Sequence, residues 1–408
     1  MIWQHRPLES LTMAQTKSAT FIGIAATLLA ALSLRIPTIS LGPLLPDIRT
    51  TTGYGETLLS LLTSVPLAMT LVVAPIAPWI ATHLGRNRVI GLALIAIAAG
   101  ICIRSLPGDV SLLIGTLLLG LGIAVGTVLL PAAISAETTA LRARLTGTYS
   151  MALSLGPALA LGLTIPIMHT TELGWRGTLA TWSSCAVIAL LCWLLHTRIN
   201  LSASTTTPPE PGPQTSGIRT AVADFRVWQI ALYLGITSIT FYTTSTWLPT
   251  TLVMDGMSSG AAGSHAAIIN IVAIPFAFIA PLIIRRGYAR VLAPLAPVGA
   301  IGGVGVLLST GAAGALISVL LFGISQGLCL GVSYDQVVRY ASSPEHAASV
   351  SAVTQALGVA LAAIGPLAYG AGLEATASAT LSLFGLGLVV VLQMLLGLRT
   401  GTFIAQRQ

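Results

Sequence analysis

Long apolar segments alternate with short polar ones along almost the whole chain. Twelve apolar runs stand out, each bounded by charged residues, by glycine and proline, or by polar clusters. Most are close to the roughly 20 residues that a helix needs to cross a bilayer. They lack the alternation of apolar and polar residues that is typical of barrel strands. Because a backbone in lipid must satisfy its own hydrogen bonds, the runs are predicted to be helices. The runs lie near residues 19–45, 57–81, 88–105, 110–135, 145–168, 177–196, 227–250, 264–284, 290–309, 312–333, 348–370 and 377–397.

The composition supports lipid as the solvent of these runs. The chain is 54% hydrophobic and only 8% charged, whereas a soluble domain carries about 25% charged residues. The mean hydropathy is +0.89. The net charge of +7 does not form one basic patch along the sequence, so nucleic-acid binding is not predicted. The sequence is therefore that of a multi-pass membrane protein.

The positive charges of the loops predict the orientation. With the N-terminus inside, the inner segments hold fifteen Lys and Arg residues and the outer loops hold only Arg49, Arg104 and Arg176. This asymmetry follows the positive-inside rule, and the even number of runs makes both termini cytoplasmic. The first run is too long for the apolar core of a signal peptide, so a retained first helix is predicted.

A hydrophilic stretch divides the runs six and six. It is rich in Ser, Thr and Pro, which is typical of a flexible linker. The two halves show weak self-similarity, as expected of transporters built from repeats with a site near the midplane. We predict an all-α membrane protein with twelve transmembrane helices in two pseudo-symmetric six-helix halves. Its parts are a cytoplasmic N-terminal segment 1–18, a bundle 19–196, the cytoplasmic linker 197–224, a bundle 225–398 and a cytoplasmic tail 399–408.

One charge lies inside a run. Arg35 is the only charged residue between Ser18 and Pro46. In a helix that begins near Ala19 it lies roughly 24 Å along, past the midpoint and toward the outer side. A cation at this depth costs about 3 kcal/mol, and no acid lies deep in another run to neutralise it. The planar guanidinium with its several N–H donors can bind an anion or a polarised acceptor in a water-filled cavity. A purely structural role in helix packing is the alternative.

Motifs for enzymatic chemistry are missing from the sequence. The four cysteines form no CxxC pair and are interpreted as small core residues, and the six histidines form no HExxH pattern. One glycine-rich run follows no strand and contains no Walker lysine, and it favours close helix packing instead. No metal, cofactor or enzymatic activity is predicted. The cysteines are Cys102, Cys185, Cys192 and Cys329, and the glycines are Gly115, Gly120, Gly122 and Gly126.

Several short stretches, taken in order, resemble those of one transporter family. They are Leu34-Arg35 with Gly42–Ile48, Gly122–Pro131, Gly147–Ala152, Phe241-Tyr242 with Thr246–Pro249, and Gly323–Gly327. The chain resembles a major facilitator superfamily transporter, and more narrowly the cyanate and 2-nitroimidazole type of bacterial permease. The resemblance covers nearly all of the chain outside the linker and the termini. It implies a bacterial inner-membrane permease that functions as a monomer.

The chain departs from the pattern of this family at some positions. The family usually has Asn-Leu-Arg-Pro in the first helix, where this chain has Ser33-Leu-Arg-Ile and a displaced Pro37. An acidic residue expected near Thr82 is missing. Thr237 and Ser154 stand where a glutamine and an asparagine are typical. These departures leave the fold expectation intact and the exact solute open.

The resemblance also implies which helices line the cavity, namely the first, fourth, seventh and tenth. Their polar residues near the middle of the runs are candidate solute contacts together with Arg35, and three residues of neighbouring helices join them. For each hydroxyl, a bond to its own helix is the alternative, and for each amide, a bond to another helix. The predicted set is Arg35, Thr38, Thr127, Tyr149, Tyr242, Thr243, Trp247, Asn270, Ser325, Gln326 and Gln355.

Charged residues at the inner ends of the runs are candidates for gating. Glu137 and Asp335 lie near arginine-rich loops with which they could pair when the outer side is open. Asp335 also precedes Arg339 by four residues, which is the spacing of an ordinary helical ion pair. A proton-coupling role of Asp335 is a further alternative. The gating set is Arg86, Arg88, Glu137, Arg285, Arg286, Asp335 and Arg339.

These observations predict a secondary active or facilitative transporter that works by alternating access. Its solute is a small polar or anionic molecule, such as a cyanate-like anion or a nitroimidazole-like heterocycle, and protons are a candidate coupling ion. The alternative is an efflux transporter of drugs or metabolites with the same fold, in which Arg35 is structural. A membrane-embedded enzyme and a membrane sensor are weaker alternatives. The expected partners are the solute and the lipid bilayer.

Overall fold

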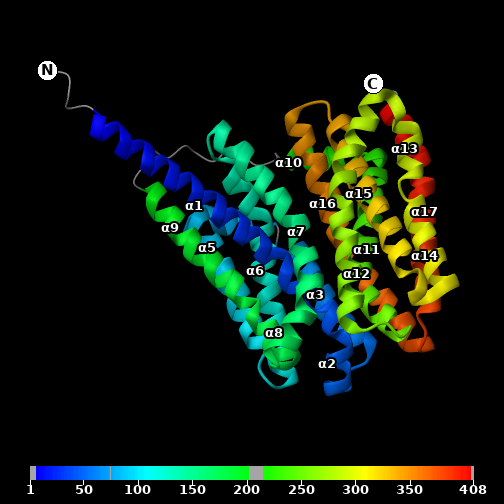
Figure 1. Ribbon diagram of the computed structural model, residues 1–408. Helices are drawn as coiled ribbons and strands as arrows, with labels where there is room; N and C mark the ends of the chain where they lie inside the picture. Colours follow the sequence, from blue (N-terminus) through cyan, green and yellow to red (C-terminus); the bar gives the residue numbers. More distant parts are fainter. Residues whose placement is uncertain (1–5, 74, 202–214, 406–408) are drawn as a thin grey trace. The chain divides into compact units, whose positions relative to one another are not determined.

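The computed structural model describes residues 6–73, 75–201 and 215–405, and among these residues it contains helices and no strand (Figure 1). The α-helices are α1 (Arg6–Ile39), α2 (Leu45–Thr52), α3 (Glu56–Val73), α4 (Ala77–Leu84), α5 (Arg86–Arg104), α6 (Asp109–Ser135), α7 (Thr139–Thr171), α8 (Gly174–Thr181), α9 (Ser183–Leu201), α10 (Thr215–Ala223), α11 (Phe225–Met254), α12 (Ser259–Ile283), α13 (Ala289–Leu295), α14 (Val298–Thr310), α15 (Ala315–Tyr340), α16 (Pro344–Thr376) and α17 (Ala379–Ala405). The all-helical class is confirmed.

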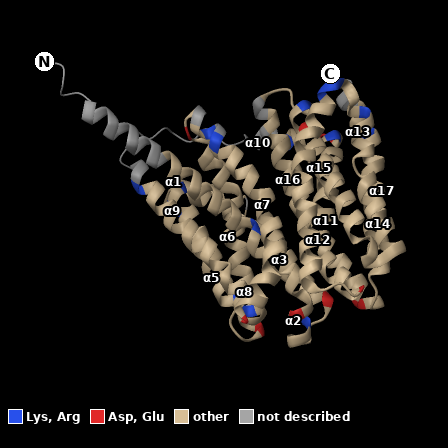
Figure 2. Ribbon diagram, in the orientation of Figure 1, with Lys and Arg blue, Asp and Glu red and all other residues tan. Residues whose placement is uncertain are grey.

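Many of these helices are long and apolar enough to cross a membrane. Nine stretches of the described residues meet that requirement, and one of them, Ser259–Tyr340, is 82 residues long and includes α12 to α15. Because 82 residues exceed the length of one crossing several times over, this stretch is long enough for more than one span. Lys, Arg, Asp and Glu lie mainly at the ends of the helices (Figure 2). The count of twelve stays a prediction.

Several predicted runs are broken by prolines or turns. The sequence predicts the first run over 19–45, whereas α1 begins at Arg6, ends at Ile39 and is followed by a short 3₁₀ turn, Gly42–Leu44, and α2. Pro37 lies inside α1 and Pro43 inside the 3₁₀ turn. Since proline removes a backbone donor and fixes φ, it favours such a break in helical continuity.

The segments predicted to lie in the cytoplasm are partly helical. Helix α1 already covers residues 6–18, and α10 lies within the stretch 197–224 that is predicted to be a flexible linker. Residues 1–5, 202–214 and 406–408, which belong to the predicted N-terminal segment, linker and tail, lie outside the described residues.

The chain forms two compact units whose boundaries cut through helices. Unit 1 consists of Met1–Pro37, Val72–Gly156 and Leu179–Glu210, and unit 2 of Thr38–Leu71, Pro157–Thr178 and Pro211–Gln408. The boundary in α1 falls directly after Pro37, and the boundary in α7 falls directly before Pro157. The second unit therefore combines short segments of the first half of the sequence with the whole second half.

Close helix packing in unit 1 depends on small residues. A Cβ at Gly115 of α6 would lie 2.6 Å from the carbonyl oxygen of Gly100 on α5. A Cβ at Gly122 would lie equally close, 2.6 Å, to the carbonyl oxygen of Ala93. No real Cβ approaches an oxygen so closely, so both positions require glycine for this helix contact. The predicted packing role of the glycine-rich run is confirmed at these two positions.

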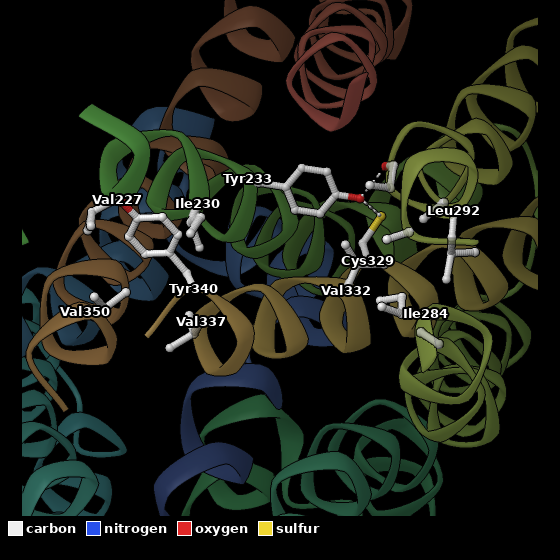
Figure 3. Packing of buried hydrophobic residues seen from close by; sticks show 14 of the residues in the cluster. Val227, Ile230, Tyr233, Ile284, Leu292, Cys329, Val332, Val337, Tyr340 and Val350 are labelled. Carbon is white, nitrogen blue, oxygen red and sulfur yellow. Dashed lines mark hydrogen bonds between the residues drawn. The ribbon is translucent and has the colours of Figure 1, made fainter. Parts of the chain in front are cut away.

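The core of unit 2 is built around a buried tyrosine on α11. The hydroxyl group of Tyr233 donates to the carbonyl oxygen of Ala293 at 2.8 Å and lies 3.8 Å from the sulfur of Cys329 (Figure 3). Valine, isoleucine and leucine side chains of α11, α13 and α15 surround this contact. The bond to Ala293 gives the hydroxyl group the partner that a buried polar group requires.

The four cysteines are free thiols, but only one is a core residue. Cys329 is buried, Cys185 and Cys192 are half-buried, and Cys102 is exposed. The interpretation of Cys102 as a core residue is therefore wrong, because an apolar run in a membrane protein has a lipid-facing side as well as a packed one. The described residues contain no group of His, Cys, Asp and Glu arranged to hold a metal.

Candidate functional site

Arg35 is half-buried in α1, and its helix packs closely against two others of unit 1. The Cβ of Arg35 lies 3.2 Å from the position that a Cβ would take at Gly156 of α7. A methyl carbon of the neighbouring Leu34 lies 2.5 Å from the position that a Cβ would take at Gly126 of α6. These glycines let α1 approach both helices, and a larger side chain at either position would displace the segment that carries Arg35.

A second arginine of unit 1, Arg104, is more deeply buried than Arg35. It is the last residue of α5 and only 1% exposed. Its Nη2 donates to the carbonyl oxygen of Pro37 at 2.7 Å. Its Nε has no hydrogen-bond partner among the described residues, and no carboxylate there pairs with it. From the sequence alone Arg104 is predicted to lie in an outer loop, because a charge at the end of an apolar run is typical of a loop residue.

Two further predicted contacts belong to unit 1. Thr127 on α6 is half-buried, and its hydroxyl group donates to the carbonyl oxygen of Ile123 at 2.8 Å. This bond to its own helix is the alternative expected for hydroxyl residues. Tyr149 on α7 is also half-buried.

Three predicted amide side chains of unit 2 lack a hydrogen-bond partner among the described residues. Asn270 on α12 is 6% exposed, Gln326 on α15 is half-buried, and Gln355 on α16 is exposed. Burying an amide without a hydrogen bond costs free energy, most of all at Asn270. Such groups are suited to bind a polar ligand, because a ligand would supply the missing bonds.

The aromatic candidates of α11 differ from each other. Tyr242 is half-buried and makes an edge contact with Phe241, with ring centroids 4.9 Å apart. Trp247 is fully buried, donates from Nε1 to the carbonyl oxygen of Pro366 at 2.9 Å and stacks on Tyr369. Because both its donor and its ring face are engaged within unit 2, this arrangement favours a packing role of Trp247.

The hydroxyl candidates of unit 2 are buried. Thr38 is 6% exposed, Thr243 is 2% exposed and Ser325 is 3% exposed. The Thr243 hydroxyl has no hydrogen-bond partner among the described residues. Ser325 Oγ lies 4.0 Å from the sulfur of Cys329, so it belongs to the core of unit 2.

The candidate gating residues make local contacts in this structure. Asp335 pairs with Arg339 at 2.6 Å, which is the ordinary helical pair that is the alternative to a gate. Glu137 lies 3.9 Å from Nε2 of His196, and Arg86 donates to the carbonyl oxygen of Ala132 at 2.9 Å. Arg88, Arg285 and Arg286 are exposed. Ion pairs between the loop arginines and these acids stay a prediction.

A charged cluster at the predicted outer end of unit 2 was missed by the sequence analysis. Glu56 at the start of α3 is 4% exposed and pairs with Arg49 of α2 at 2.6 Å. The carboxylate of Glu374, at the end of α16, accepts a hydrogen bond from the backbone N–H of Thr57 at 2.8 Å. A carboxylate at a helix N-terminus satisfies a backbone donor and interacts favourably with the helix dipole. An acid from the second half of the sequence therefore caps a helix of the first half.

A second link at this end joins the same helices through one carbonyl group. The carbonyl oxygen of Pro366 on α16 accepts from Ser60 Oγ on α3 and from Trp247 Nε1 on α11, both at 2.9 Å. A cavity of about 330 Å³ lies beside the Arg49–Glu56 pair and is lined by Arg49, Glu56 and Thr250, among others. Helix α3 is thus linked to α11 and α16, and α2 is linked to α3 by the Arg49–Glu56 pair.

Comparison with known proteins identifies the family of this helical chain. The sequence pattern of the Major Facilitator Superfamily matches residues 23–366. The chain belongs to the major facilitator superfamily. Over 384 residues it is 33% identical to the 2-nitroimidazole transporter of Escherichia coli (strain K12), which covers 93% of this chain and 95% of that protein. The cyanate transport protein CynX of the same organism is 27% identical over 343 residues, covering 83% of this chain and 86% of that protein.

Solved structures agree at the level of the fold. A bacterial homologue of the human lysosomal transporter Spinster, in an inward-facing and unoccupied conformation, matches with a TM-score of 0.73 at 18% identity, covering 95% of this chain and 96% of that one. A D-xylose–proton symporter matches with a TM-score of 0.69 at 16% identity, covering 94% and 97%. The predicted superfamily, its resemblance to the cyanate and 2-nitroimidazole permeases, and the prediction of a multi-pass membrane transporter rather than an enzyme are confirmed.

Proposed function

We propose that this superfamily member moves a small polar or anionic solute across the bacterial inner membrane by alternating access. The solute is a cyanate-like anion or a nitroimidazole-like heterocycle. The observation that carries the proposal is the 33% identity, over 93% of this chain, to a protein named a 2-nitroimidazole transporter. The match to the cyanate transport protein CynX supports the same solute class from a second relative.

Arg35 is the proposed main electrostatic contact of the solute. It is half-buried, and its helix is seated against glycines of α6 and α7. A guanidinium in apolar surroundings is a strong donor to an anion or a nitro group, because it offers several N–H groups in one plane. Tyr149 and Thr127 complete the proposed contacts of unit 1.

The proposed contacts of unit 2 are neutral. Asn270, Gln326 and Gln355 supply amides without partners among the described residues, and Tyr242 supplies an aromatic ring for a flat ligand. We propose that the solute exchanges part of its hydration shell for these groups. Its affinity has to be similar in the two facing states, because a solute that strongly favoured one state would trap the transporter there.

The topology belongs to the same proposal. We propose twelve membrane-spanning helices in two halves, with both termini in the cytoplasm and the monomer as the working unit. When the outer side is open, a set of inner arginines and acids is proposed to form ion pairs that close the inner side. The set is Arg86, Arg88, Glu137, Arg285, Arg286, Asp335 and Arg339. Protons are the candidate coupling ion.

Transport by wild-type protein and Arg35→Ala in proteoliposomes tests the proposal. Cyanate and 2-nitroimidazole are offered with and without an imposed pH gradient. We expect transport of at least one solute by the wild type and a loss of roughly 10- to 100-fold in the variant, the equivalent of a charged hydrogen bond. Dependence on the gradient would identify proton coupling.

Two outcomes would oppose the proposal in different ways. Equal rates of both proteins, with the variant folded, would make Arg35 a structural residue. Efflux of varied lipophilic compounds that is unchanged in Arg35→Ala would support the alternative of a drug or metabolite exporter.

A further inference from the structure

The proposed solute site leaves the buried Arg104 without a role. Its side chain is 1% exposed, which is deeper than any other arginine of the described residues. A buried cation without a carboxylate is costly and is normally retained for a function or held by other polar groups. Arg104 has such a polar group within unit 1, because its Nη2 donates to the carbonyl oxygen of Pro37 at 2.7 Å.

Pro37 lies in the last turn of α1, two residues after Arg35. At 1.5 Å per residue, the two positions are about 3 Å apart along the helix axis. Carbonyl groups in the last turn of a helix lack donors from a following turn, and a cation there is favoured by the helix dipole. The guanidinium of Arg104 therefore stabilises the last turn of α1, two residues beyond Arg35 in the sequence.

Arg104 is itself held firmly. A Cβ at Gly115 of α6 would lie 2.6 Å from the Cβ of Arg104, so this helix packs against the base of the arginine side chain. Gly126 and Gly156 contact α1 at Leu34 and Arg35. Residues 34–37 are thus fixed at successive positions by α6, α7 and the end of α5.

We propose that Arg104 is a positioning residue of the solute site. Through the Pro37 carbonyl it fixes the end of α1 and thereby the place of Arg35. It also adds a positive charge that no acid of the described residues cancels, which favours anionic solutes. The proposal rests on the proposed function, in which Arg35 contacts the solute.

The test compares Arg104→Met, which removes the donors, with Arg104→Lys, which keeps a cationic donor. The matched control is Arg198→Met, the same replacement at an exposed arginine of unit 1. We expect Arg104→Met to raise the KM for 2-nitroimidazole or cyanate about tenfold, because a displaced Arg35 would lose most of its charged hydrogen bond to the solute, with a much smaller change in kcat. Arg104→Lys should restore most of the affinity, and Arg198→Met should match the wild type.

A double variant separates positioning from general stability. In an Arg35→Gln background, Arg104→Met should change KM much less than in the wild type, because Arg104 acts through Arg35. A merely structural arginine would lower the amount of folded protein equally in both backgrounds and leave KM alone. If Arg104→Met does not fold, Arg104→Gln takes its place.

Hydrogen–deuterium exchange gives a readout that needs no solute. The backbone amides of residues 38–42 and 44 should exchange faster in Arg104→Met than in the wild type or in Arg104→Lys. Unchanged exchange, or an unchanged KM in a folded Arg104→Met variant while Arg35→Ala raises it, would overturn the role of Arg104 and leave the proposed function intact. An unchanged KM in Arg35→Ala would instead overturn the proposed function.

Discussion

Two regions of the molecule contain an arginine held by a buried partner, and the partners differ in charge. In the Arg35–Arg104 region of unit 1, formed by these two residues with Pro37 and Gly156, the acceptor of Arg104 is a backbone carbonyl. In the Arg49–Glu56 region of unit 2, formed by these two residues with Thr57 and Glu374, the arginine pairs with a carboxylate at 2.6 Å. Of the two, the second region alone contains acids.

The difference is whether a carboxylate neutralises the arginine, as in the Arg49–Glu56 region, or a neutral carbonyl group binds it, as for Arg104. Arg49 and Glu56 neutralise each other, and Glu374 is matched to a helix N-terminus, so this region is complete without a ligand. A backbone carbonyl supports Arg104 but carries no net charge, so the unit charge of the guanidinium stays in place. The guanidinium of Arg104 therefore keeps its positive charge, which favours an anion over a cation in its surroundings.

The largest expected effect concerns solute selectivity in the Arg35–Arg104 region. Arg35→Gln keeps a hydrogen-bond donor and removes the charge. We expect transport of cyanate, an anion, to fall roughly 10- to 100-fold, which is the contribution of a charged hydrogen bond. Transport of 2-nitroimidazole, offered below its own pKa where it is uncharged, should fall less. The ratio of the two rates in proteoliposomes is the measurement, and an equal fall for both solutes would contradict the comparison.

The next effect tests the pairing of the Arg49–Glu56 region. Arg49→Gln leaves the buried carboxylate of Glu56 without its cation, whereas Glu56→Gln leaves Arg49, whose side chain is 56% exposed, in contact with water. We expect a loss of about 2 kcal/mol of stability for Arg49→Gln, below that of a fully buried pair, and of about 1 kcal/mol or less for Glu56→Gln.

Thermal unfolding of the purified variants, compared with the double variant Arg49→Gln/Glu56→Gln, checks this asymmetry. The double variant should be more stable than Arg49→Gln alone, since it buries no unpaired charge. Equal destabilisation by the two single variants would show that the burial of Glu56 does not determine how much stability is lost when the pair is broken.

Much of the fold was accessible from the sequence because it depends on composition and periodicity. Apolar runs of membrane-spanning length, the position of Arg35 inside one of them and the family resemblance required no knowledge of contacts between distant residues. Close packing at Gly115 and Gly122 was also predicted, because small residues at helical spacing let the backbones of neighbouring helices approach each other.

The contacts that were missed are long-range. Glu374 is 317 residues from Thr57, and Arg104 is 67 residues from Pro37. A local pattern shows the charge but not the acceptor, so the sequence alone places Arg104 in a loop. The same limitation applies to Trp247, whose burial depends on Pro366 and Tyr369 of another helix. The residues at which α1 and α3 end were not predicted, because prolines are common inside membrane helices and only some of them end a helix.

The smallest expected effect concerns the cap of α3. Glu374→Gln keeps an oxygen that can accept from the N–H of Thr57 but removes the negative charge at the helix N-terminus. Because this carboxylate is exposed to solvent and its charge is screened, we expect a slight decrease in thermal stability and an unchanged KM.

Glu374→Ala, which also removes the acceptor, should lower stability further and speed amide exchange at the start of α3. The control is Glu172→Gln, an exposed acid of unit 2 at which no effect is expected. If Glu374→Gln altered KM as strongly as Arg35→Gln, the acids of unit 2 would take part in solute binding. The contrast between an arginine neutralised by a carboxylate and an arginine held by a backbone carbonyl would then not explain which region binds the solute.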